Sequence, residues 1–208
     1  KQIENHHQGA AMKRAIKVLQ LAPLGAGGVT SLILNIDGHL DRNQVVFDYM
    51  TFYDRKELRE DQALQYGGKK YVVPIDHFDN FILRAAFKFF CSIKVIRQCS
   101  PDIIHINASS PYDMMIAVSA KIAGVKKVVI HSHNSSMKKV SGIRLAVMGI
   151  CKCMLPLISD CNLACSELAA RHMFPGYVLK KGAYTILPNG IDSQKYRFCD
   201  EIRQTWRK

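Results

Sequence analysis

Pro23–Ser31 reads PLGAGGVTS, and this glycine-rich stretch decides the fold. It follows an apolar run over residues 16–22 and leads directly into Leu32–Ile36, which is again mostly apolar. An apolar run, clustered glycines and then apolar residues at helical spacing are typical of a strand, a tight turn and a helix. The stretch therefore predicts the opening unit of an α/β domain of the nucleotide-binding type.

Gly27 and Gly28 stand where the predicted turn meets the predicted helix. Residues without a Cβ atom let the backbone turn sharply, and they let a ligand approach the N–H groups at the start of a helix. A phosphate is the ligand that such a turn suits best. Glycines of this kind are equally typical of close packing, so both interpretations stay open at this point.

The rest of the chain alternates between strand-like and helix-like segments, without hairpin signals. Strands are expected at residues 44–51, 70–73, 101–107, 127–133, 161–165 and 184–187, and the longer helices at residues 55–65, 81–98, 112–123 and 143–158. Strands separated by helices pair in parallel through right-handed crossovers. The pattern predicts an α/β fold, a doubly wound and mostly parallel Rossmann-like sheet of about seven strands with helices on both faces.

The positive charge is concentrated in the middle of the chain. The net charge is +12, and residues 80–159 carry eleven basic and two acidic side chains. Such a field favours an anionic partner, either a membrane surface or a phosphorylated substrate, although a merely solvated surface is an equal alternative. Nucleic acid is not expected as a partner, because no nucleic-acid-binding motif accompanies the charge.

Cysteine usage and hydropathy bear on the compartment. The seven cysteines have no disulfide-framework spacing, which indicates a reducing compartment, and they lack the CxxC pairs of a metal site, so buried and inert thiols are expected. No signal peptide is visible before Met12. The apolar stretch over residues 143–158 contains Arg144 and Lys152 and is too short to span a bilayer. These features predict a cytoplasmic protein.

Short motifs at the ends of the predicted strands, four after a strand and one entering a strand, occur in a distinctive order. The set comprises Gly27-Gly28-Val29, Pro101-Asp102-Ile103-Ile104-His105, His131-Ser132-His133-Asn134, Ala164-Cys165-Ser166-Glu167 and Leu187-Pro188-Asn189-Gly190-Ile191-Asp192. In order and spacing it resembles the amino-terminal domain of retaining glycosyltransferases of family 4, which have the two-domain GT-B fold. The resemblance covers nearly the whole chain and is greatest to bacterial enzymes of capsule and exopolysaccharide synthesis.

The resemblance implies an enzyme that moves a sugar from a nucleotide-sugar donor to a glycan or polyprenyl-diphosphate-linked acceptor in polysaccharide biosynthesis. It implies no cofactor and no metal, since the nucleotide sugar is a substrate. In this family the amino-terminal domain mainly binds the acceptor, whereas the carboxy-terminal domain grips the donor with a glutamate pair that this sequence lacks. The expected location is the cytoplasm, extending to the inner face of the cell membrane, where peripheral association with anionic lipid is expected.

Three parts are therefore expected along the chain. Residues 1–14 form a tail that is disordered or not native to the protein, residues 15–191 form the Rossmann-like acceptor-side domain, and residues 192–208 form a linker and the first helix of a missing carboxy-terminal domain. Without that domain, the chain on its own is expected to be inactive.

The resemblance also implies roles for individual residues. Gly27 and Gly28 contact the donor phosphate and sugar, and His133 is the catalytic candidate, which orients a sugar hydroxyl or shares the acceptor proton. Asn134 stands where the family commonly has an aspartate, which removes a negative charge. His105 and His131 are expected to be structural. The implied acceptor contacts are Asn107, Ser109, Ser110, Tyr112, Asn134 and Ser135, and the implied interdomain hinge is Asn189 and Gly190.

Two other functions stay open. Gly25–Thr30 nearly matches the dinucleotide fingerprint, and Asp48 lies downstream, as in an NAD(P)-dependent oxidoreductase. Thr30 occupies the position of the third fingerprint glycine, which counts against this interpretation. The other alternative is a non-catalytic Rossmann-like module that binds an anion.

Overall fold

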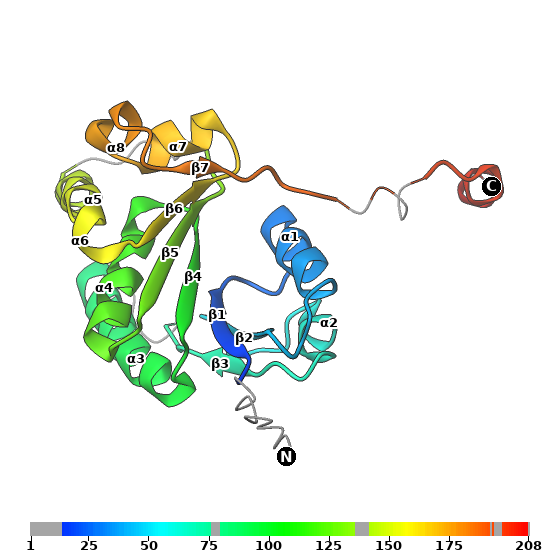
Figure 1. The fold of residues 1–208 in the computed structure, drawn as a ribbon, viewed down its shortest axis with the longest axis horizontal. Coiled ribbons are helices and arrows are strands. Elements are labelled where there is room, and N and C mark those ends of the chain that lie inside the picture. The colour runs from blue at the N-terminus through cyan, green and yellow to red at the C-terminus, as the bar shows by residue number, and fades with distance from the viewer. Residues whose placement is uncertain (1–13, 76–79, 136–141, 192, 194–196, 208) are drawn as a thin grey trace, which may run out of the picture.

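The computed structural model describes residues 14–75, 80–135, 142–191, 193 and 197–207. Residues 1–13 of the predicted tail, residues 136–141 with Lys138 and Lys139, and the start of the predicted linker at Asp192 lie outside the described residues. The remainder forms one sheet covered by helices (Figure 1).

The sheet is parallel throughout, and its seven strands confirm the predicted doubly wound architecture. The strand order is β3-β2-β1-β4-β5-β6-β7, and every neighbouring pair is parallel. The strands are β1 (Ile16–Leu21), β2 (Val45–Thr51), β3 (Lys70–Val72), β4 (Ile103–Ala108), β5 (Lys127–Ser132), β6 (Cys161–Ala164) and β7 (Thr185–Ile186).

Helices cover both faces of the sheet. Figure 1 shows α1 and α2 on one side and α3 to α6 on the other, while α9 lies away from the sheet at the carboxy-terminal end. The helices are α1 (Gly28–Asp37), α2 (Glu60–Leu64), α3 (Phe81–Cys99), the 3-10 turn η1 (Pro111–Asp113), α4 (Met114–Ala123), α5 (Ile143–Cys153), α6 (Leu155–Ile158), α7 (Glu167–Met173), α8 (Gly176–Lys180) and α9 (Asp200–Trp206).

Two apolar clusters form the core, one on each face. Alternation along β1 divides the strand between them: Leu19 and Leu21 join the larger cluster with α3 to α8, whereas Val18 joins the smaller one with α1 and α2. Successive side chains of a strand point to opposite faces, so a strand between two layers of helices must be apolar on both. This explains why the central strands read as nearly continuous apolar runs.

The strand order reverses between β1 and β4. From β1 the chain proceeds outward through β2 to β3, and then α3 carries it back across to β4, on the other side of β1. In open parallel sheets ligands bind outside the carboxyl ends of the strands at such a reversal. The ends of β1 and β4 therefore locate the candidate site.

Three helix ends have the capping geometry that their residue types favour. The Asn80 side chain accepts hydrogen bonds from the amides of Ile82 and Leu83 at the start of α3, and Ser166 accepts one from Ala169 at the start of α7. Gly124 ends α4 with a φ of 89°, in the left-handed region that favours glycine.

Two predicted helices were too long. The helix expected over residues 55–65 begins only at Glu60, because Glu57 is buried and bonded to the amide of Leu24 instead of continuing a helix. The helix expected over residues 143–158 is divided at Met154 into α5 and α6. Pro156 lacks an N–H group and its ring would clash with the preceding turn, so α5 ends before it and Pro156 stands in the first turn of α6.

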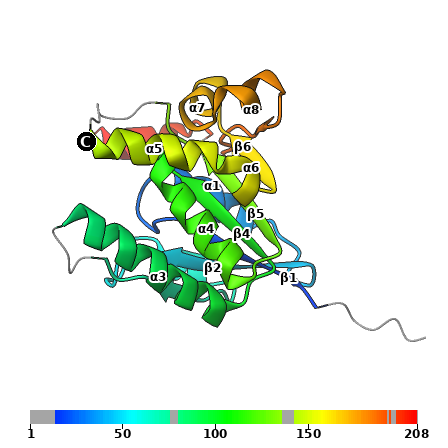
Figure 2. The same ribbon diagram turned by 90° about the vertical axis from the view of Figure 1, so that its left-hand side faces the viewer.

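Helix α3 covers the sheet only in part. Ile96 is fully buried, but Ile82 and Phe90 remain 59% and 67% exposed. Figure 2 shows why: the amino-terminal end of α3 projects past α4, beyond the sheet. Since the helix is longer than the layer it covers, its first turns have no sheet beneath them.

Two further observations concern hydropathy and the cysteines. Among the described helices, none has the length and hydropathy needed to cross a bilayer. All seven cysteines are free thiols, and Cys153 and Cys161 are exposed, so the expectation of uniformly buried cysteines was wrong.

Candidate functional site

The glycine turn at the end of β1 is open on its outer side. Gly27 is the N-cap of α1 with a φ of −73°, and neither Gly25, Gly27 nor Gly28 has a positive φ. A Cβ atom placed on any of the three would meet no atom within 4 Å. Neither a sharp turn nor close packing therefore requires glycine here. The missing side chains leave free space above the start of a ten-residue helix, where a ligand phosphate is stabilised by N–H groups and the helix dipole.

Side chains outside the turn hold it in place. Glu57, which is 8% exposed, accepts a hydrogen bond from the amide of Leu24 at 2.8 Å. Arg59 donates from its amide to the carbonyl of Leu24 at 2.9 Å and from its guanidinium to Ser31 Oγ at 2.7 Å. Sequence reasoning missed Glu57 and Arg59, because nothing in their local pattern distinguishes them from the other charges of an exposed helix.

Thr30 has a structural role in the same turn. Its side chain is buried, and Oγ1 donates to the carbonyl of Pro23 at 2.7 Å. A third fingerprint glycine would remove this bond. Thr30 therefore stabilises this turn through its side chain, at the position where a dinucleotide-binding turn has glycine.

Asn107 connects the ends of β1, β4 and β5. Its Nδ2 donates to Gln20 Oε1 at 3.1 Å and to the carbonyl of Leu21 at 3.3 Å. A carbonyl can only accept, so Oδ1 faces His133, whose Nε2 lies at 3.0 Å. This arrangement assigns the proton of His133 to Nε2. The structure thus brings two of the predicted site residues into direct contact.

His133 is the outermost of three packed imidazoles. The ring centroids of His105 and His131 are 5.4 Å apart, and those of His131 and His133 are 4.0 Å apart. Within the described part of the chain, no well-formed hydrogen bond reaches either nitrogen of His131 or Nδ1 of His133. Leu187 and Asn189 make only weak hydrogen-bonding contacts with these two rings. His105 and His131 lie inside β4 and β5, as their expected structural role requires.

Burial keeps these imidazoles neutral. Desolvation lowers the pKa of His105 to about 4, that of His131 to about 3 and that of His133 to about 4, where Asn189 opposes part of the effect. Neighbouring histidines lower the pKa of His105 and His131 further. At neutral pH, His133 is therefore a neutral hydrogen-bonding group. Its Nε2 is bonded to Asn107 and its Nδ1 is buried, so contact with a substrate requires the ring to turn.

The loop after β4 is held in place by hydrogen bonds to the carboxylate of Asp113. Asp113 Oδ2 accepts from the amides of Ser109 and Ser110 at 3.0 and 3.1 Å, and Oδ1 lies 3.4 Å from Lys88 Nζ. The ammonium of Lys88 also lies 4.0 Å from the centre of the Phe52 ring. Neither Lys88 nor Asp113 was predicted as a site residue, although the Ser-x-x-Asp spacing is the signature of a capping box.

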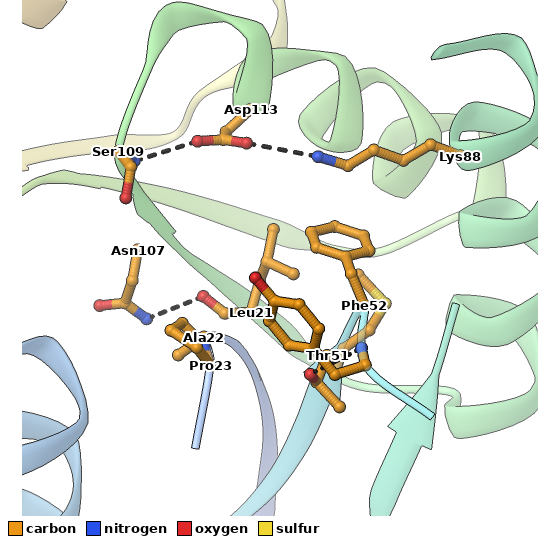
Figure 3. A pocket seen from close by; sticks show the side chains of 11 residues that line it. Leu21, Ala22, Pro23, Thr51, Phe52, Lys88, Asn107, Ser109 and Asp113 are labelled. Carbon is orange, nitrogen blue, oxygen red and sulfur yellow. Dashed lines mark hydrogen bonds and ion pairs between the residues drawn. The ribbon is translucent and has the colours of Figure 1, made fainter. Parts of the chain in front are cut away.

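A small pocket lies at the carboxyl ends of β1, β2 and β4 (Figure 3). It has a volume of about 210 Å³, and Asn107, Ser109, Lys88 and Asp113 supply its polar lining together with Thr51. Gly27, Gly28 and His133 are not among the described residues that line it.

The predicted acceptor residues are divided between two places. Asn107 and Ser109 line the small pocket, and Asn134 is tied to it because its Nδ2 donates to the carbonyl of Ser109 at 3.1 Å. Ser110 and Tyr112 line a second cavity beside α3. The remaining predicted residues, Ser135 and the hinge residues Asn189 and Gly190, are exposed. Among the described residues, no cluster of histidine, cysteine or carboxylate side chains fits a metal ion.

The fold and the site define the class of protein: a Rossmann-like domain with an open glycine turn and a polar carboxyl edge, of the kind from which GT-B enzymes are built. The comparison with family models then gives the family. Residues 26–195 match the model described as "Glycosyltransferase Family 4", and the chain belongs to this family.

Individual relatives agree with this assignment. The chain is 26% identical over 190 residues to the "Putative glycosyltransferase EpsF" of Bacillus subtilis (strain 168), covering 90% of this chain and 47% of EpsF. Anabaena Alr3699/HepE, solved with UDP and glucose, has a TM-score of 0.62 at 18% identity, covering 92% of this chain and 50% of HepE. The lipopolysaccharide outer core galactosyltransferase WaaB in its apo form has a TM-score of 0.55 at 15% identity, covering 86% and 44%.

The chain thus spans about half the length of the curated relative that it matches. The two solved structures establish the shared fold. None of these findings supports the oxidoreductase alternative.

Proposed function

We propose that this chain is the acceptor-side half of a retaining glycosyltransferase of polysaccharide biosynthesis. In this proposal a sugar passes from a nucleotide sugar to a glycan or lipid-linked acceptor bound at the ends of β4 and β5. A donor-binding half supplies the grip on the nucleotide, because the chain corresponds to only 47% of EpsF. The chain alone is then inactive.

The open glycine turn is the observation that carries the proposal. Gly27 and Gly28 leave free space above the start of α1, next to the strand reversal where ligands of such sheets bind. In a family 4 chain, this is where the diphosphate of the donor would lie, with its negative charge stabilised by backbone N–H groups. HepE was solved with UDP and glucose, which supports a nucleotide sugar as donor.

The residues of this chain are proposed to contribute charge stabilisation and hydrogen bonds. The helix N-terminus stabilises charge on the leaving diphosphate, Asn107 and Ser109 offer neutral hydrogen bonds to a sugar, and His133 orients a sugar hydroxyl through an imidazole that is neutral at pH 7. Because desolvation lowers the pKa of His133 to about 4, the imidazole is neutral at pH 7 but only a weak base, so its proposed role is to hold a sugar hydroxyl by a hydrogen bond and not to remove its proton. No step of this proposal uses a metal or a redox cofactor.

Peripheral membrane association is part of the proposal. The predicted positive region of the sequence includes α3, which carries Arg84, Lys88, Lys94 and Arg97 and no acidic residue. Basic surfaces gain affinity for anionic lipid, and screening by salt weakens the attraction. Sedimentation with vesicles at low salt should therefore recover more protein with anionic lipid than with neutral lipid. Equal recovery would contradict the proposed membrane association.

Sugar transfer is the direct test. We expect the chain alone to show no transfer from any nucleotide sugar, and the chain fused to the donor-binding half of a family 4 enzyme to be active. His133→Ala and Asn107→Ala in the fusion should each lower kcat at least tenfold, since both groups contact the sugar in this proposal. Transfer by the chain alone, or stabilisation of the chain by NAD(P) but not by sugars, would contradict it.

Gly28→Ala separates ligand binding from folding. The added methyl group meets nothing in the free protein, and alanine favours a helix over glycine by up to about 1 kcal/mol. We therefore expect an unchanged or higher free energy of unfolding, together with at least a tenfold loss of transfer in the fusion. Chemical denaturation and the transfer assay measure the two effects.

Gly176→Ala is the matched control. Gly176 is likewise the first residue of a helix with nothing near its missing Cβ atom, but it lies in α8, away from the predicted site. It should match Gly28→Ala in stability and leave transfer unchanged. Equal activity of the two variants would show that the space above Gly28 is not used.

A further inference from the structure

The small pocket and the glycine turn start from the same two strand ends. Pro23, the first residue of the turn, and Thr51, the last residue of β2, both line the pocket (Figure 3). β1 and β2 are parallel neighbours, and a bond from the amide of Ala22 to the carbonyl of Met50, at 3.2 Å, continues their pairing as far as the pocket. Bonds to one neighbour recur at every second residue of a strand. The next donor toward β2 is therefore the amide of Leu24, and it bonds to a side chain instead.

The carboxylate of Glu57 takes the place of the strand pairing. Oε1 accepts from the amide of Leu24 and Oε2 accepts from Thr51 Oγ1, both at 2.8 Å. Glu57 is buried, and Lys70 Nζ, at 4.0 Å from Oε2, balances its charge. A carboxylate offers each donor its own acceptor oxygen, whereas an amide side chain has only one oxygen. One buried acid thus joins the turn to the wall of the pocket.

Arg59 attaches the turn to the same segment at two more points. Its amide donates to the carbonyl of Leu24 at 2.9 Å, and its guanidinium donates to Ser31 Oγ at 2.7 Å. The amide of Ser31 donates to the carbonyl of Gly27 at 3.1 Å, so Ser31 lies one helical turn after Gly27. The open start of α1 is therefore fixed to the segment that carries the buried acid.

The pocket wall is attached to this acid through a single hydroxyl group. Thr51 leads directly into Phe52 and Tyr53, and all three residues line the pocket. Thr51 Oγ1 accepts from the amide of Tyr53 at 3.2 Å and donates to Glu57. A displacement of the wall therefore changes the bond to Glu57, and through it the position of the amide of Leu24.

We propose that Glu57 is a positioning residue that fixes the pocket wall and the glycine turn relative to each other. A sugar in the pocket and a phosphate on the turn are then held at the separation that reaction between them requires, within about 0.5 Å. The inference rests on the proposed function and adds a residue that touches neither substrate. Support of the turn alone would need one acceptor for the amide of Leu24, but the second oxygen is bonded to the pocket wall.

Thr51→Val tests the connection in the 208-residue chain without a ligand. Valine has a similar shape and removes the hydroxyl that donates to Glu57. The observed groups are the amides of Gly27 and Gly28, neither of which is among the described residues that line the pocket. We expect their chemical shifts to change and their heteronuclear NOE values to fall, because the turn loses its tie to the wall. Thr51→Ser keeps the hydroxyl and should restore both values.

Ser109→Ala is the matched control for these spectra. It also removes a hydroxyl from the pocket lining, but the backbone of Ser109 is bonded to Asp113 and not to Glu57. The amides of Gly27 and Gly28 should not change in this variant. Equal changes in Thr51→Val and Ser109→Ala, or no change in either, would overturn the proposal.

Glu57→Gln is the second variant for the same spectra, should Thr51→Val fail to fold. Glutamine keeps an oxygen for the amide of Leu24 and replaces the acceptor of Thr51 by an NH2 group. The amides of the turn should again change, and urea unfolding shows whether each variant is folded. Turn amides that stay as in the unmodified chain would contradict the positioning role.

The kinetics of the fusion separate positioning from contact. With donor and acceptor both saturating, Thr51→Val should lower kcat at least tenfold, because a wrong separation persists when both sites are filled. Loss of one contact to the acceptor would instead raise the acceptor KM and leave kcat unchanged, and that result would overturn the proposal. Thr51→Ser should restore kcat.

Failure of the positioning role can be told from failure of the proposed function. If the fusion transfers sugar and Thr51→Val leaves kcat unchanged, the transferase stands and the role of Glu57 falls. If the amides of the turn respond as expected and the fusion transfers no sugar, the link between pocket and turn stands and the proposed function falls.

Discussion

Between pH 6.5 and pH 4.5, the free energy of unfolding is expected to fall by up to about 4 kcal/mol per pH unit. The cause is the group of buried imidazoles, His105, His131 and His133, whose pKa values lie at about 4, 3 and 4. An unfolded histidine has a pKa of about 6.5, so in this window the unfolded chain binds protons that the native chain excludes. Each such proton changes the stability by about 1.4 kcal/mol per pH unit.

The sign is that of acid destabilisation. The contribution of these histidines is fully present above the unfolded pKa and is lost as the pH falls toward the folded values. The carboxyls of Asp102 and Asp160 also have lowered pKa values, set first by hydrogen bonds from Arg14 and Lys121. Their contribution is lost below the unfolded pKa of about 4. The slope above pH 4.5 therefore isolates the histidines.

Urea unfolding at a series of pH values measures this slope. Burial also lowers the pKa of the less buried His172, so His131→Leu removes one of four such histidines among the described residues and should flatten the slope by about one quarter to one third. His39→Gln is the control, since His39 is exposed on the surface beyond α1, and it should leave the slope unchanged. A slope that His131→Leu does not alter would show that the imidazole group is not the source.

Glu57→Leu is expected to lower the free energy of unfolding by about 3 kcal/mol. The carboxylate is buried and accepts from the amide of Leu24 at 2.8 Å and from Thr51 Oγ1 at 2.8 Å. Leucine leaves both donors unpaired, and each unsatisfied buried donor costs about 1–3 kcal/mol. Because Leu24 belongs to the glycine turn, the same variant should loosen the turn and increase hydrogen exchange of its amides.

Two further variants complete this test. Glu57→Gln keeps one acceptor for the amide of Leu24 and should be clearly less harmful than leucine. Asp61→Asn removes a charge from the exposed pair with Lys56, which typically changes stability by less than about 1 kcal/mol. If Glu57→Leu is no more harmful than Asp61→Asn, Glu57 does not support the turn.

Much of the fold could be predicted because its signals are local. The apolar run before Pro23, the cap at Asn80 and the left-handed glycine at Gly124 each act within a few residues of their own position. Parallel pairing follows from the alternation of strands and helices. One error lies where a distant contact intervened: Glu57 bonds to Leu24 across 33 residues, so the helix around it begins later than its composition predicts. The division of the helix over residues 143–158 has a local cause, Pro156.

The candidate site was predictable in its outline. The polar ends of the strands meet at one edge of the sheet, and Asn107 and His133 are in contact there. Lys88 and Asp113 could not be predicted as partners, because a long helix and a capping box come together only when α3 crosses back to β4. The division of Ser109 and Tyr112 between two cavities likewise depends on which way η1 turns.

The sequence by itself determined the order of the elements, the parallel sheet and the position of the glycine turn, since each depends on the character of neighbouring residues. Only the tertiary structure decided that the space above Gly27 and Gly28 is free, that the buried His131 and the half-buried His105 and His133 have ring nitrogens without partners, and that the start of α3 extends past the sheet. Those properties belong to surfaces and cavities formed by residues far apart in the chain. Their physical reason is the packing of layers, which no local pattern specifies.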